Sequence, residues 1–150
     1  RDDTEFKVGN VYNLPIMDGC VDAAFSITVW FHLEHLSKTS EELFRVLKSG
    51  GHFIIITADP DAYDIWKTHY DDIQMDGKKF IGKARVLLNP DEPTPIFSEI
   101  SKNTFYLHTL NDILSSLKTS NLLVENVEKI GYLPIHRGRN LFVCISGKKV

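Results

Sequence analysis

Residues 21–56 constrain the fold of this chain more than any other part of its sequence. Residues 23–29 are mostly apolar and predict a strand. Residues 40–48 place apolar side chains at helical spacing after Thr39 or Ser40 as the predicted cap, and two glycines follow. Residues 53–57 are apolar without polar alternation, which is typical of a strand covered on both faces. A strand, a helix and a strand in this order predict one unit of a parallel α/β sheet.

The rest of the chain adds elements on both sides of this unit. Residues 6–8 predict a short strand. The sequence Thr109-x-x-Asp112 and the apolar spacing after it predict a capped helix that ends near Asn121. Residues 122–127 and 141–145 predict two strands, and the short connection between them favours antiparallel neighbours.

Residues 61–102 form a long insertion between the two halves of the chain. The segment holds several prolines and aromatic residues, and it exceeds the length of an ordinary connection. We expect an irregular lid or substrate-facing insertion within a single domain of residues 1–150. A surface excursion without function is the alternative.

Composition argues against several classes of partner. The 17 basic and 20 acidic residues give a net charge of −3, so nucleic acid is not expected to bind. No apolar run approaches the roughly 20 residues of a membrane span, so we expect no membrane partner. Cys20 and Cys144 are predicted to be free thiols in a reducing compartment. The predicted location is therefore the cytoplasm.

Three segments with ligand-binding character follow expected strands. They are Asn10-Val11, Thr28-Val29-Trp30 and Thr57-Ala58-Asp59. Open α/β sheets bind ligands outside the carboxyl ends of their strands. If these strands are parallel, the three segments lie along one rim, where Val11 and Trp30 offer apolar or flat contact.

Four segments in order resemble the class I S-adenosylmethionine-dependent methyltransferases of the small-molecule, type 11-like group. Residues 9–15 resemble the family's G-D-A-x-x-L-P, and residues 21–26 resemble F-D-x-V-x-S. Residues 29–34 resemble V-L-x-H-L-E, and residues 42–51 follow E-x-x-R-V-L-K-P-G-G. Asn10 replaces the usual Asp, and Ser49 replaces the usual Pro. The resemblance covers residues 6–57 in detail and the rest only in layout.

This resemblance implies a fold, a cofactor and a set of site residues. The implied fold is a partial doubly wound, Rossmann-like α/β sheet that is mostly parallel, with an antiparallel C-terminal strand. The implied cofactor is S-adenosylmethionine, and the implied reaction is methyl transfer to a small molecule. Asn10 and Val11 would flank the adenine, and Thr28, Val29, Trp30 and His32 would line the methionine and methyl part. His32 and His108 are the candidates for a general base.

The first two strands of such a fold, and the Gly-rich loop that holds the cofactor, have no counterpart before Val21. We therefore expect a truncated domain that is inactive alone and binds the cofactor weakly or not at all. The strand at residues 23–29 would carry an unpaired edge, through which the chain would be able to self-associate.

Other interpretations of the sequence remain open. A degenerate, non-enzymatic binding or scaffold domain is one, and the upstream sequence would distinguish it. Tyr63-x-x-x-Lys67 matches the catalytic pair of short-chain dehydrogenases, although the nicotinamide loop of those enzymes has no counterpart here. His32 and His35 lie three residues apart, but complementary ligands are missing and no metal is expected. Residues 136–139 are basic and read as a polar hairpin tip.

Overall fold

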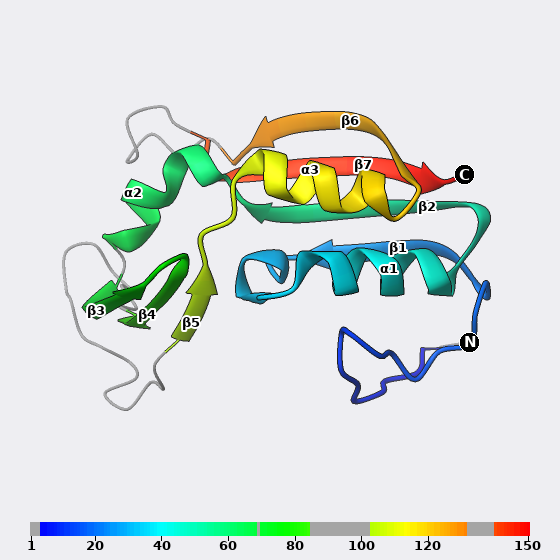
Figure 1. Ribbon diagram of the computed structural model, residues 1–150, viewed down its shortest axis with the longest axis horizontal. Helices are drawn as coiled ribbons and strands as arrows, with labels where there is room; N and C mark the ends of the chain where they lie inside the picture. The colour runs from blue at the N-terminus through cyan, green and yellow to red at the C-terminus, as the bar shows by residue number, and fades with distance from the viewer. Residues whose placement is uncertain (1–3, 69, 85–102, 132–139) are drawn as a thin grey trace.

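The computed structural model describes residues 4–68, 70–84, 103–131 and 140–150. Its main sheet has the strand order β1-β2-β7-β6, and Figure 1 shows two helices, α1 and α3, lying in front of it. β1 pairs with β2 in parallel, whereas β7 runs antiparallel to both β2 and β6. Three of the four strands therefore point the same way, which confirms the predicted α/β class with an antiparallel C-terminal strand. The elements are β1 (Val21–Ile27), α1 (Leu36–Val46), β2 (Leu47–Ala58), α3 (Leu110–Thr119), β6 (Leu122–Ile130) and β7 (Phe142–Lys149).

Helix α1 begins earlier in the chain than the sequence predicted. Thr39 and Ser40 lie inside the helix, and His35 is the N-cap residue, so the predicted cap was wrong. Ser40 is fully buried, and its Oγ lies 2.9 Å from Oγ of Ser116 on α3. The hydroxyl of Ser40 thus joins the two helices to each other, because α1 and α3 pack side by side on the sheet.

The two faces of the main sheet differ in burial. α1 and α3 cover one face, where Phe53 and Ile55 are almost fully buried. On the other face Phe25 and Ile27 are 69% and 59% exposed. The described residues place no helix there, so the prediction that residues 53–57 are covered on both faces was wrong for this part of the chain. Burial along β2 alternates for the same reason.

The predicted strand at residues 6–8 does not form. Phe6 and Val8 are almost wholly exposed, and the strand-like pairing of this segment is a single bridge between Asn10 and Asn13. A strand needs a hydrogen-bonding partner, and residues 6–8 do not reach β1. Within the described ranges β1 pairs with β2 alone, so its other edge is open there, as predicted.

The insertion contains more regular structure than we predicted. A short 3₁₀ turn, η2 (Pro60–Ala62), leads into the five-residue helix α2 (Tyr63–Lys67). A hairpin and a returning strand then form a second, three-stranded sheet in the order β3-β4-β5. Figure 1 shows this sheet beyond the arrowheads of β1 and β2, which is the ligand-binding end of the main sheet. Its strands are β3 (Tyr70–Asp76), β4 (Lys79–Ala84) and β5 (Asn103–Tyr106).

The prediction of an irregular stretch was therefore wrong for residues 61–84, because the hairpin turn at Gly77, with φ of 56°, lets two strands pair. Residues 85–102 lie outside the described ranges, and the lid role stays a prediction.

The C-terminal third follows the sequence closely. Thr109 and Asp112 form the predicted capping box of α3, and Asn121 leaves the helix with a φ of 59°. β6 and β7 are antiparallel neighbours, as predicted. The basic segment 136–139 lies outside the described residues. Both cysteines are free thiols, as predicted. In the ranges that the structure covers, no helix has the length and apolarity to cross a bilayer; the cytoplasmic location stays a prediction.

Candidate functional site

The carboxyl ends of β1 and β2 meet at one rim, as their parallel pairing requires. The backbone N–H of Thr28 donates to the carbonyl of Ile56 at 2.7 Å, which joins the chain just after β1 to the end of β2. Thr28 has a φ of 59°, a left-handed conformation that costs energy for a β-branched residue. Such strain at the end of a parallel strand is typical of a ligand-binding turn.

The loop that carries Asn10 and Val11 is held against α1. Oδ1 of Asn10 accepts a hydrogen bond from the backbone N–H of Tyr12 at 2.9 Å. The Tyr12 hydroxyl in turn accepts from the backbone N–H groups of Glu34 and His35, at 3.1 and 3.3 Å, next to the start of α1. These contacts place the loop beside the rim, close to the turn that follows β1.

Glu42 and Arg45 of α1 hold the next part of the same loop. Glu42 is buried, and its Oε1 accepts the Leu14 N–H at 2.6 Å. Arg45 donates to both carboxylate oxygens of Glu42, at 2.8 and 2.6 Å, and to the carbonyls of Leu14 and Ile16. The hydrogen bond from Arg45 holds the pKa of Glu42 below its ordinary value. The pair therefore fixes the loop to α1.

We expect the substitution Glu42→Ala to lower the free energy of unfolding by about 2 kcal/mol, because it leaves the Leu14 N–H and Arg45 without their shared partner. Urea denaturation measures this loss, and hydrogen exchange at the Leu14 amide should accelerate. Glu41→Ala is the matched control on the exposed side of α1, with an effect within about 0.5 kcal/mol. Equal effects of the two substitutions would contradict this role of Glu42.

A groove of about 420 Å³ runs along the open edge of β1. Its walls include Val11, Val29 and Trp30, so the loop before β1 and the turn after it share one space. The volume lies in the range of small-molecule sites. Val29 is partly exposed, whereas Trp30 is 2% exposed and belongs to the core cluster. Most of the Trp30 ring therefore packs inside the protein.

His32 lies on the rim with a fixed ring. It is the last residue of the 3₁₀ turn η1 (Trp30–His32), and its side chain is exposed. Its Nδ1 lies 2.9 Å from the carbonyl of Thr104. Because a carbonyl only accepts hydrogen bonds, Nδ1 carries the proton, and Nε2 of the neutral ring holds the lone pair. The ring also packs against Phe105 at 4.7 Å between centroids. His32 thus presents a proton acceptor in a defined orientation.

His108 is buried and Tyr63 is half-buried, and a hydrogen bond joins the two residues. Nε2 of His108 donates to the Leu33 carbonyl at 2.6 Å, and burial lowers the pKa of His108, which keeps the ring neutral. The Tyr63 hydroxyl donates to the His108 carbonyl at 3.1 Å. Burial, followed by the charge of Asp59, raises the pKa of Tyr63. The Tyr63 hydroxyl of the Tyr63-x-x-x-Lys67 motif is thus engaged with a backbone carbonyl.

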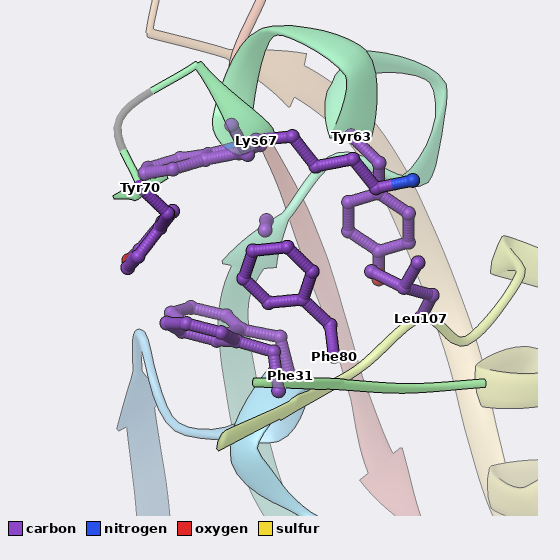
Figure 2. A pocket seen from close by; sticks show the side chains of 9 residues that line it. Phe31, Tyr63, Lys67, Tyr70, Phe80 and Leu107 are labelled. Atoms are coloured by element: carbon purple, nitrogen blue, oxygen red, sulfur yellow. The ribbon is translucent and has the colours of Figure 1, made fainter. Parts of the chain in front are cut away.

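An aromatic pocket lies where the second sheet meets the end of β2. Figure 2 shows Phe31, Tyr70 and Phe80 arranged about a common centre, with Lys67 across the top. Ala58 at the end of β2 lines the same pocket, so it adjoins the rim. Phe31 also contacts the His32 ring, with 4.3 Å between centroids. The lining residues are Phe31, Ala58, Tyr63, Trp66, Lys67, Tyr70, Phe80, Phe105 and Leu107.

Sequence reasoning found some of these residues but not the pocket. The aromatic residues of the insertion suggested a substrate-facing surface. Phe31 gave no separate signal, because it lies inside the motif of residues 29–34. The pairing of β4 with β5 brings Phe80 and Phe105 together, and this register is not visible in the sequence.

A buried carboxylate completes the rim at the end of β2. Asp59 is 3% exposed and lies 3.1 Å from Nζ of Lys129, which also contacts Asp61. These two carboxylates raise the pKa of Lys129, with Asp61 the larger influence.

His32 and His35 do not form a metal site with other ligands, since the part of the chain that the structure describes contains no group of three metal-binding side chains.

Comparisons with known proteins find similarity to methyltransferases. Residues 1–55 match the family model described as a methyltransferase domain. The chain is also 32% identical over 94 residues to the demethylmenaquinone methyltransferase of Paenarthrobacter aurescens (strain TC1), a match that covers 61% of this chain and 36% of that protein.

Solved structures show the same fold. The PH0226 protein of Pyrococcus horikoshii OT3 superposes with a TM-score of 0.71 at 20% identity, covering 99% of this chain and 60% of that one. A SAM-dependent methyltransferase of Methanosarcina mazei superposes with a TM-score of 0.67 at 19% identity, covering 97% and 67%. This chain therefore spans about a third of the curated relative and three fifths of the first of these structures.

Proposed function

We propose that the chain is part of a class I S-adenosylmethionine-dependent methyltransferase, which the matched family model and the shared fold support, and that it transfers a methyl group to a small-molecule acceptor as part of a complete cofactor site. The observation that carries the proposal is the position of His32. Its ring belongs to the turn η1 that follows β1, and it packs against Phe31 and Phe105, two walls of the aromatic pocket. Cofactor and acceptor would meet at this point.

The residues present fit one side of the cofactor, S-adenosylmethionine. Asn10 is exposed and keeps its amide N–H₂ free within the described ranges, so it offers a donor to an adenine edge. Val11 and Val29 line the adjoining groove. Thr28 and the backbone of Trp30 would lie along the methionine part. The sequence before β1 has no Gly-rich loop for the carboxypropyl group, so we propose that this chain alone is inactive.

The chemistry of the reaction divides between the cofactor and the chain. When bound, the cofactor supplies an electrophilic methyl group. The aromatic pocket would align the acceptor with the rim and exclude water, which is the main source of rate in such a displacement. Nε2 of His32 would accept the proton of the attacking group, and the Thr104 carbonyl would stabilise the resulting charge through Nδ1. His108 does not line this pocket. It would act as a structural link, because its ring binds the Leu33 carbonyl and its own carbonyl accepts the Tyr63 hydroxyl.

Nuclear magnetic resonance tests the cofactor half of this proposal. We expect S-adenosylhomocysteine to bind this chain weakly, with a Kd on the order of 1 mM, and to shift the amide signals of Asn10, Val11, Thr28 and Val29. Asn10→Ala should weaken binding further, and signals from β6 serve as the internal control. Shifts confined to other regions, or tight binding at micromolar concentration, would contradict the assignment of a half-site.

A second candidate function rests on the open edge of β1. Phe25 and Ile27 are exposed beside unpaired backbone groups, which favours a binding or scaffold role through self-association at this edge. Sedimentation at increasing concentration distinguishes the two functions. A dimer that Phe25→Lys dissociates would support the scaffold role, whereas a monomer at all concentrations would remove it.

A further inference from the structure

We propose that Tyr12 and Tyr106 are positioning residues for His32, and that their hydroxyls hold residues 32–35, the junction that ends η1 and leads into α1. Tyr12 belongs to the loop proposed to flank the adenine, and Tyr106 belongs to β5 of the second sheet. The inference rests on the proposed function, because it names the residues that keep the proposed base in place. The evidence is a set of hydrogen bonds that converge on the junction from two distant parts of the chain.

β5 and the residues after it bind the junction at two unlike contacts. The Thr104 carbonyl lies 2.9 Å from Nδ1 of His32, and this contact is exposed. Just after β5, the buried ring of His108 donates from Nε2 to the Leu33 carbonyl at 2.6 Å. The buried contact anchors this end of the strand, whereas water competes for the exposed one. The orientation of the His32 ring therefore depends on what keeps β5 in place beside η1.

Tyr106 supplies a hydrogen bond between those two contacts. Its hydroxyl donates to Oε2 of Glu34 at 3.1 Å. Burial, followed by the hydrogen bond to Glu34, raises the pKa of Tyr106, so the hydroxyl keeps its proton and remains a donor. The Tyr106 ring also stacks on the ring of His108, at 19° and 6.2 Å between centroids. Tyr106 thus ties β5 to the junction two residues away from the Thr104 carbonyl.

Tyr12 holds the same junction from the cofactor loop. Its hydroxyl accepts hydrogen bonds from the backbone N–H groups of Glu34 and His35, at 3.1 and 3.3 Å. Its own backbone N–H donates to Oδ1 of Asn10 at 2.9 Å, so the residue proposed to meet the adenine lies in the same turn. Glu34 therefore binds Tyr12 through its backbone and Tyr106 through its carboxylate, and the two hydroxyls fix the junction together.

The tautomer of the His32 ring tests this inference on the 150-residue chain without cofactor. Nitrogen-15 spectra at about pH 8.5, where a histidine ring is neutral, give the ratio of rings protonated at Nδ1 to rings protonated at Nε2. We expect Tyr106→Phe and Tyr12→Phe each to lower this ratio about fivefold, the effect of one hydrogen bond. Glu34→Ala should act like Tyr106→Phe, and the double variant should lose no more than either single one, because both remove the same contact.

Glu34→Gln is the conservative variant, since its amide oxygen still accepts from Tyr106, and it should keep the wild-type ratio. Glu41→Ala, on the exposed side of α1, is the matched control and should keep it too. A wild-type ratio in either tyrosine variant would overturn the inference, as would additive losses in the double variant. A merely structural tyrosine would lower the melting temperature and leave the ratio unchanged.

In the active protein, Tyr106→Phe should lower kcat about fivefold with an unchanged Km for the cofactor, and an unchanged kcat would contradict the positioning role. The tautomer ratio is measured without cofactor, so it is independent of methyl transfer. Failure of S-adenosylhomocysteine to shift the rim would instead contradict the proposed function.

Discussion

Replacing His32 with glutamine is expected to lower kcat for methyl transfer by about 100-fold or more in the active protein. The glutamine amide is able to donate to the Thr104 carbonyl, as Nδ1 of His32 does, but its carbonyl oxygen is a far weaker base than Nε2. The Km for the cofactor and the melting temperature should change little, since the ring is exposed. Transfer of labelled methyl from S-adenosylmethionine, followed against pH, measures the effect.

The control for this substitution is His35→Gln, three residues away and also exposed. His35 lies beside the Tyr12 ring, and not beside the aromatic pocket. Its replacement should leave kcat and the pH profile unchanged. A nitrogen-15 spectrum of the wild-type imidazole tests the premise directly, because Nδ1 of His32 should carry the proton. Full activity of His32→Gln, or a proton on Nε2 in the neutral ring, would contradict the assignment.

Gly147→Ala is expected to cause the largest loss of stability among single substitutions in the sheet. Gly147 lies on β7 between Phe53 of β2 and Val124 of β6. A Cβ at this position would overlap the carbonyl oxygen of Leu123 and approach the Phe53 ring to 2.9 Å. Leu123 presents backbone here, so no side-chain rotation relieves the clash. The free energy of unfolding should fall by about 3 kcal/mol or more, as measured in urea.

Gly77→Ala separates steric overlap from backbone conformation. Gly77 has a φ of 56° in the β3–β4 turn, but a Cβ there would meet nothing within 4 Å. Its replacement should cost only about 1 kcal/mol, the price of a left-handed residue. The prediction for Gly147 would be wrong if both alanine variants lost similar amounts, because the position inside the sheet would then carry no special constraint.

Local patterns in the sequence were sufficient for the parts of the fold that depend on near neighbours. The capping box at Thr109 and Asp112 satisfies backbone donors within one turn, so the sequence predicts the start of α3 accurately. The apolar run before Ala58 predicts β2 and its parallel pairing with β1, but the two glycines predicted to stop the helix lie inside β2, which begins at Leu47 directly after α1. The sequence placed the start of α1 too late in the chain. Hydrogen bonds from distant segments determine this region, because the Tyr12 hydroxyl binds the backbone at His35 and Ser116 binds the Ser40 hydroxyl.

The candidate site also has one part that local sequence patterns indicate and another part that only long-range contacts determine. The four motifs and the rule that ligands bind at strand ends were enough to indicate Asn10, Thr28 and His32 from the sequence. The sequence did not indicate the roles of Glu42 and Arg45. The loop carbonyls to which Arg45 donates lie far away in the chain. The dehydrogenase interpretation of Tyr63-x-x-x-Lys67 stays a prediction, and the hydrogen bond from the Tyr63 hydroxyl to the His108 carbonyl is a property of the packed structure alone.

By itself, the sequence determined the α/β class and the order of the elements β1, α1, β2, α3, β6 and β7, because these depend on periodicity, caps and turns within a few residues. The tertiary structure alone decided that Phe31, Trp66, Phe80 and Phe105 surround one pocket, and that the His32 ring packs against Phe105 with Nδ1 bound to the Thr104 carbonyl. Those facts depend on the pairing of β4 with β5 and on the Thr104 carbonyl reaching His32 across 72 residues of chain. Contacts of that range arise only when the packed elements bring distant segments together.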